Sequence, residues 1–112
     1  DVRCSAAEAV AVVAPPGDGQ AVTALVTLTE DGDADVRWSA MRALHHVARR
    51  GNSDSIRAAS RCAKDSDEQV QIAAINALSA LAEKGNPETL VLLKGCLQGS
   101  PDVNQAAMRS ML

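Results

Sequence analysis

Residues 33–44 read DADVRWSAMRAL, which sets two acidic residues directly ahead of an apolar stripe with helical spacing. Asp33 is a favourable N-cap, and Asp35 falls in the first turn, where the helix dipole favours negative charge. The apolar positions recur at the intervals that define one face of an α-helix. They are Val36, Ala40, Ala43, Leu44 and Val47. The stretch therefore predicts the start of an amphipathic helix.

The same arrangement recurs through the whole chain with a nearly constant period. Equivalent valines lie 34, 34 and 33 residues apart, at Val2, Val36, Val70 and Val103. A second block repeats in the same register, as glycines that are each followed by Asp or Asn. These glycines are Gly17, Gly51 and Gly85. Two blocks in one register indicate a repeat protein.

Each unit predicts two helices. The first, helix A, has about 15 residues, and the second, helix B, has about 11. We expect the glycine at the left-handed C′ position that ends helix A, and the following Asp or Asn as the N-cap of helix B. A short turn makes the two helices antiparallel neighbours, and stacking of successive pairs buries their apolar stripes.

The predicted fold is therefore all-α, an α-solenoid of about three and a half repeats of 33–34 residues. The chain is predicted to be one domain, residues 1–112. Its units are residues 1–32, 33–66, 67–99 and the partial unit 100–112.

The composition agrees with an all-α fold. The chain has no Phe, no Tyr and one Trp, so its apolar residues are mainly Ala, Val and Leu, and strand-forming residues are sparse. No apolar run is long enough to span a membrane, and no signal peptide is evident. Three cysteines without CxxC spacing predict buried thiols and a reducing intracellular compartment, the cytoplasm.

Three of the repeated stretches carry a family resemblance. DADVRWSAMRALHHVA, DEQVQIAAINALSALA and SPDVNQAAMRSML resemble HEAT repeats, and more closely the short HEAT-like repeats of phycobilisome lyases, with the pattern D-x-x-V-R-x-x-A-x-x-A-L. The second unit matches every fixed position, whereas later copies depart at Gln71, Asn104 and Ser110. Tetratricopeptide repeats need aromatic residues that this chain lacks, and the ankyrin T-P-L-H-x-A motif is absent.

The chain ends lack the polar outer faces that cap solenoids. We therefore expect a segment of a longer repeat protein. The alternative is a naturally short protein whose uncapped terminal helices permit end-to-end self-association.

The sequence offers no evident catalytic, cofactor or metal site. His45 and His46 are adjacent, so they point about 100° apart on a helix and cannot easily share a metal ion. HEAT-like di-iron hydroxylases use His-Glu pairs, and no such dipeptide occurs here. We expect a non-enzymatic scaffold without a cofactor. The enzyme alternative is a subunit of a complex such as a bilin lyase, which rests on the resemblance alone.

Charge is distributed unevenly. Residues 35–64 hold seven basic and two acidic residues, which gives a net charge of +5. The whole chain has a net charge of −3, so the remaining residues have a net charge of −8. Arg57, Arg61 and Lys64 are spaced as one stripe on helix B of the second unit. In the HEAT family the helix-B row lines the concave face. The hypothesis is a protein partner whose acidic or phosphorylated segment binds there.

Three residues of the second helix A complete the predicted partner-binding set. Arg37 and Arg42 are basic, and Arg37 has the alternative role of an inter-repeat polar contact, as the resemblance implies. Trp38 lies off the apolar stripe, where it packs against a neighbouring unit or serves as an exposed binding residue. Nucleic acid is a further candidate partner, which the acidic balance and the lack of stacking aromatics argue against.

Overall fold

The computed structural model describes residues 2–82 and six isolated positions beyond them. The isolated positions are Pro87, Val91, Lys94, Gly95, Gln105 and Met108. Predictions for the third helix B, for the partial fourth unit, and for Gly85 and Cys96 lie outside the described residues.

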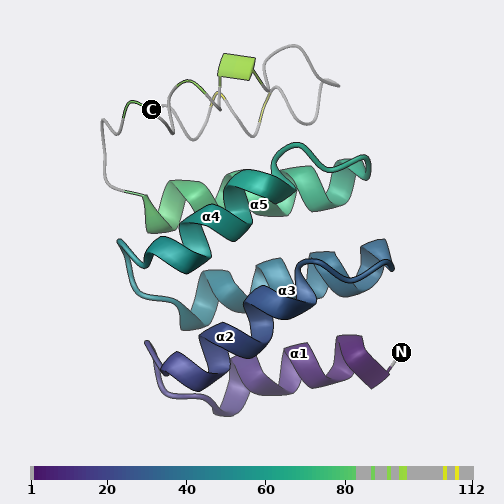
Figure 1. The fold of residues 1–112 in the computed structure, drawn as a ribbon, viewed down its shortest axis with the longest axis vertical. Coiled ribbons are helices and arrows are strands. Elements are labelled where there is room, and N and C mark those ends of the chain that lie inside the picture. The colour runs from purple at the N-terminus through teal and green to yellow at the C-terminus, as the bar shows by residue number, and fades with distance from the viewer. Residues whose placement is uncertain are drawn as a thin grey trace.

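Five helices follow one another along residues 2–82, and they confirm the all-α helical-repeat fold (Figure 1). They alternate between a longer helix A and a shorter helix B, as the repeat predicts. Their bounds are α1 Val2–Val13, α2 Gly19–Leu28, α3 Ala34–Val47, α4 Ser53–Cys62 and α5 Glu68–Leu81.

Side-chain caps begin the helices where the sequence places them. Asp33 accepts a hydrogen bond from the N–H of Asp35 at the start of α3, and Asp67 caps α5 in the same way. Asp18 caps α2, and Asn52 caps α4 through the N–H of Ser55. Each cap satisfies backbone donors that have no partner within the helix.

The turn between helix A and helix B differs from the prediction. Gly17 and Gly51 do have positive φ angles, of 81° and 87°. However, α3 ends at Val47, and its C-cap Ala48 is extended, so Gly51 lies in the turn well beyond C′. The turn glycines form inter-unit hydrogen bonds instead of closing their own helices. The Gly17 N–H donates to the Val47 carbonyl at 2.7 Å, and the Gly51 N–H donates to the Leu81 carbonyl at 2.7 Å.

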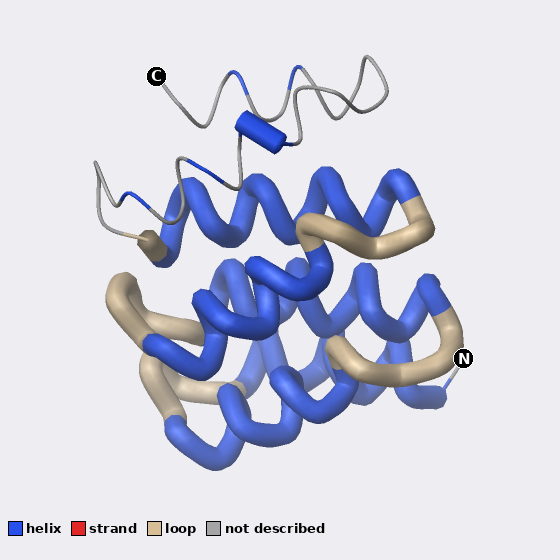
Figure 2. Tube along the Cα trace, turned by 45° about the horizontal axis from the view of Figure 1, so that its top comes forward, coloured by secondary structure: helices blue, strands red, loops and turns tan. Residues whose placement is uncertain are grey.

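The helices form two rows (Figure 2). α1, α3 and α5 pack side by side as the helix-A row, and α2 and α4 lie across them as the helix-B row. Each helix B packs chiefly against the helix A of the following unit: α2 against α3, and α4 against α5. The predicted neighbours within one unit are therefore not the main packing partners, since the extended turn after helix A separates the two ends.

The predicted stripe forms the core. Val36, Ala40 and Leu44 are fully buried, and Met41, which the stripe omits, is buried with them. The outer face of α1 is apolar and exposed, at Val2, Val12 and Val13, which are 85%, 83% and 77% exposed. None of the described helices has the length and apolar character needed to cross a membrane.

Candidate functional site

The structure distributes the six predicted partner-binding residues over three places. Arg57, Arg61 and Lys64 lie on the helix-B row, and Arg37 bridges two loops. Trp38 and Arg42 lie on the helix-A row. They therefore do not form one continuous site.

Arg37 holds two inter-unit loops together. Its Nε and Nη2 donate to the two carboxylate oxygens of Asp65 at 2.8 and 3.1 Å, and its Nη1 donates to the Asp31 carbonyl at 2.8 Å. The side chains of Arg37 and Asp65 are only 16% and 11% exposed. The hydrogen bond that Arg37 donates to Asp65 raises the pKa of Arg37, so the guanidinium stays charged. These contacts support the structural role for Arg37.

The same contact recurs one unit earlier. Arg3 donates to Asp31 at 2.7 Å, and both residues lie 34 positions before Arg37 and Asp65. Sequence reasoning singled out Arg37 but missed the aspartates. The signal was present, because Asp31 and Asp65 share the 34-residue period.

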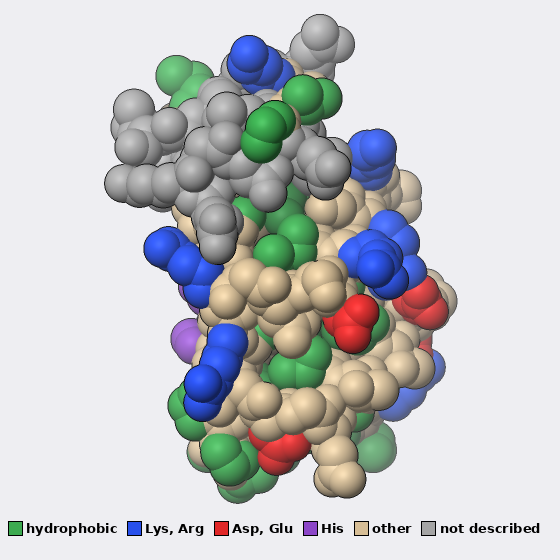
Figure 3. Space-filling model, turned by 60° about the vertical axis from the view of Figure 1, so that its left-hand side comes forward, with side chains coloured by type: hydrophobic (Ala, Val, Ile, Leu, Met, Phe, Trp, Pro, Cys, Tyr) green, Lys and Arg blue, Asp and Glu red, His purple; other side chains and the backbone are tan. Residues whose placement is uncertain are grey.

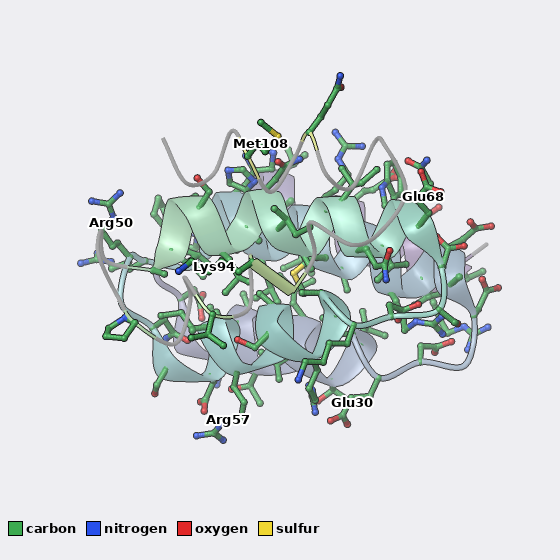
Figure 4. All side chains as sticks on the ribbon, turned by 90° about the horizontal axis from the view of Figure 1, so that it is seen from above. Glu30, Arg50, Arg57, Glu68, Lys94 and Met108 are labelled. Carbon is green, nitrogen blue, oxygen red and sulfur yellow. The ribbon has the colours of Figure 1, made fainter. Side chains whose placement is uncertain are left out.

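The basic stripe on helix B is shorter than predicted. α4 ends at Cys62, so Lys64 lies in the following turn. Arg61 forms an ion pair with Glu30, whereas Arg57 approaches Asp54 only at 3.9 Å with both side chains exposed. Figure 4 shows Arg57 and Glu30 on the outer side of the helix-B row. Exposed pairs of this kind contribute little stability, so an incoming carboxylate can replace them.

Trp38 and Arg42 form a ridge on the helix-A row. The guanidinium carbon of Arg42 lies 4.7 Å from the centre of the Trp38 ring, a cation–π contact. Trp38 is half-buried and packs against the core. Two hollows flank the ridge. The one between α1 and α3 has about 210 Å³ and contains Glu8, and the one between α3 and α5 has about 500 Å³.

The hollow between α3 and α5 has a mixed lining. Four residues are polar or cationic, and the others are apolar. They are Trp38, Arg42, His45, Ile72, Ala73, Asn76, Ser79 and Ala80. The α5 residues were not predicted to belong to a site, because their sequence is that of an ordinary helix face.

Each hollow has one histidine: His45 lines the α3–α5 hollow, and His46 lines the α1–α3 hollow. The rings of His45 and His46 stack with their centres 5.6 Å apart. Burial, followed by the neighbouring His46, lowers the pKa of His45, so its ring is neutral at pH 7. Figure 3 shows His side chains together with Lys and Arg along the left edge, whereas at the right Lys and Arg lie beside Asp and Glu.

The described part of the chain contains no group of three His, Cys, Asp or Glu side chains placed to hold a metal ion. Cys62 is buried, as predicted, and Cys4 is half-buried; both are free thiols. Burial is the main cause that raises the pKa of Cys62 to about 11, so it is not a nucleophile at neutral pH.

The helix pairs, their 34-residue period and the recurring inter-unit contacts describe a helical repeat. The sequence profile described as HEAT repeats matches residues 22–112. The chain belongs to the HEAT-repeat family. No curated protein matches the sequence significantly. The likeness to phycobilisome-lyase repeats in particular stays a prediction. HEAT repeats generally serve as protein-interaction scaffolds.

Proposed function

We propose that this HEAT-repeat chain is a non-enzymatic scaffold that binds an acidic or phosphorylated segment of a protein partner on its helix-B row. The observation that carries the proposal is the exposed cationic group on and after α4. Arg57 has only a distant, solvent-exposed counter-ion, and Lys64 is exposed in the following turn. Arg61 extends the group toward α2 through Glu30.

The surroundings of this group favour a peptide. Thr23 and Thr27 are exposed on α2 of the same row, although their hydroxyls donate to carbonyls of their own helix. Val91 is 70% exposed at the corresponding position of the third unit. Such a surface offers charge at the second unit and neutral or apolar contact at its neighbours. That distribution suits an extended segment with a central cluster of negative charge.

Neither alternative function has a specific observation in its favour. A bilin-lyase role rests on resemblance alone. Nucleic-acid binding needs a continuous basic surface, yet Glu30 and Asp54 interrupt the cations of α4. The free thiols at Cys4 and Cys62 support a reducing intracellular location.

Charge reversal tests the proposal directly. Wild-type protein and the R57E/R61E variant are cross-linked in extract and the captured proteins are identified by mass spectrometry. We expect one or more partners to be captured by the wild type and not by the variant. Synthetic peptides with the acidic segments of those partners should then bind the wild type and not the variant. R49E/R50E is the matched control, because it changes the net charge equally in the turn before α4. Equal capture by R57E/R61E and wild type refutes the helix-B site.

A further inference from the structure

The hollow between α3 and α5 lies on the helix-A row, and its lining combines apolar and polar side chains. Trp38 and Ile72 supply apolar surface at one end. Arg42 supplies the cationic charge at the rim, and His45 beside it supplies a neutral imidazole ring. No acidic side chain is among the described residues that line it, and the volume of about 500 Å³ lies in the range typical of ligand sites.

Arg42 is the decisive residue. It is exposed, and within residues 2–82 no carboxylate forms an ion pair with it. Its contact with Trp38 holds the guanidinium over the ring, and the side chain lines both hollows. Arg37 and Arg61 differ, because each already binds a carboxylate of this chain.

We propose that the α3–α5 hollow docks a short acidic peptide segment of a protein partner, with an apolar side chain against Trp38 and a carboxylate on Arg42. Charge complementarity selects the occupant: a carboxylate satisfies Arg42, and a basic segment is repelled. The neighbouring α1–α3 hollow is less suited to the same ligand, because Glu8 lines it.

The α5 side of the hollow adds neutral polar groups. Asn76 and Ser79 are exposed on α5 and bring neutral hydrogen-bonding groups opposite Arg42. These groups bind peptide amides and carbonyls without a charge requirement. A nucleic acid is a poorer occupant, because Arg42 covers one face of the Trp38 ring on which a base would stack.

A protonation change accompanies this binding. Among the described residues, Arg42 is the other titratable group that lines the hollow and His46 adjoins His45 on α3, while the lining residues of α5 are neutral. A bound carboxylate favours the protonated ring of His45. Affinity for an acidic peptide therefore rises as the pH falls into the range in which His45 becomes protonated.

Trp38 is the only tryptophan of the chain, so its fluorescence reports on the site directly. The probe is the Trp-free peptide acetyl-EELEE-amide, with acetyl-KKLKK-amide as the charge control. We expect a saturable change of emission with the acidic peptide alone. R42A weakens binding about tenfold, which corresponds to loss of one charge-assisted hydrogen bond. S79E, which adds a carboxylate to an exposed position of the hollow, weakens it as well.

Matched controls separate this site from the helix-B site. R57E should leave the fluorescence titration unchanged. R42A should still capture the partners that bind through Arg57 and Arg61. Either proposal can therefore fail alone. H45A removes the pH dependence and keeps binding at pH 7.5. Circular dichroism confirms that each variant is folded. The proposal is overturned by no saturable response to EELEE, by an equal response to KKLKK, or by insensitivity to both R42A and S79E. A saturable response to oligo(dT) in place of the peptide assigns the hollow to nucleic acid and also overturns it.

Discussion

The backbone N–H of Gly17 donates a 2.7 Å hydrogen bond to the carbonyl of Val47, the last residue of α3. One unit later, Gly51 makes the same bond to Leu81, the last residue of α5. Each glycine thus satisfies a carbonyl at the C-terminus of the next helix A, where no intrahelical donor is available. The positive φ angle that directs this N–H is the reason for the periodic glycine.

Substitution of these glycines by alanine should destabilise the fold unequally. The left-handed conformation disfavours alanine by about 1–2 kcal/mol at either position. At Gly17 the added Cβ also overlaps the side chain of Arg49, whereas at Gly51 it meets no atom of the described residues within 4 Å. We expect G17A to lower the free energy of unfolding in urea more than G51A does. In an R49A background the two effects should become equal; a G17A protein as stable as wild type contradicts this account.

The Arg37–Asp65 pair should couple strongly in a double-mutant cycle. Both side chains are largely buried and share two hydrogen bonds. R37Q and D65N should each lower the free energy of unfolding by about 2 kcal/mol, because each leaves a partner unsatisfied. The double variant should lose less than the two single losses added together, with coupling of about 1 kcal/mol or more. Purely additive losses would show that the pair acts independently.

The repeat itself supports that coupling. In the third unit the equivalents of Arg37 and Asp65 are Gln71 and Gly99, so both members change together. The more exposed pair of Arg3 and Asp31 is the natural comparison. R3Q should lower the free energy of unfolding by less than about 1 kcal/mol, as is typical of exposed ion pairs.

Ser55→Ala should stabilise the protein. Ser55 is fully buried, and its hydroxyl has no hydrogen-bond partner within the described part of the chain. The hydrogen bond from the Ser55 backbone N–H to the Asn52 side chain is unaffected by the change. The first unit has Ala21 at this position. We expect a gain of about 1 kcal/mol in urea unfolding. S60A is the control, because the Ser60 hydroxyl already donates to the Ile56 carbonyl; a loss of stability in S55A would reveal an unrecognised partner.

Local features were predictable from sequence, and distances between helices were not. Asp33 and Asp67 are N-caps because a cap depends only on neighbouring residues. The 34-residue period likewise fixed which residues are buried, such as Val36 and Leu44. In contrast, the packing of α4 on α5 depends on the path of the turn after α3, which no local pattern specifies.

The candidate sites show the same limit. The pattern marked Arg57 and Arg61 as one stripe but could not show that Glu30, from the preceding unit, pairs with Arg61. Trp38 and Arg42 were identified as unusual members of their repeat, and their cation–π contact follows from their spacing of four residues. The hollow beside them needs Ile72 and Asn76 of α5, which lie 30 or more residues away along the chain.

The buried thiol of Cys62 should make stability fall in alkaline solution. Burial, followed by Asp65, raises the pKa of this thiol in the folded protein from 9.0 to about 11, while Arg61 and Arg37 act in the opposite direction. Between these values the unfolded chain loses the proton and the folded protein retains it. The stabilisation is therefore complete below pH 9 and is lost as the pH rises to about 11.

C62A removes this dependence. The difference in the free energy of unfolding between wild type and C62A should shrink by roughly 2–3 kcal/mol from pH 8.5 to 11, as expected for a shift of this size. The chain has no Tyr, so few other groups titrate in the window. Iodoacetamide labelling at pH 8, mapped by mass spectrometry, provides an independent check. Cys4, which is only half-buried, should react well before Cys62. Equal labelling rates in the native protein would show that α4 opens readily and exposes Cys62.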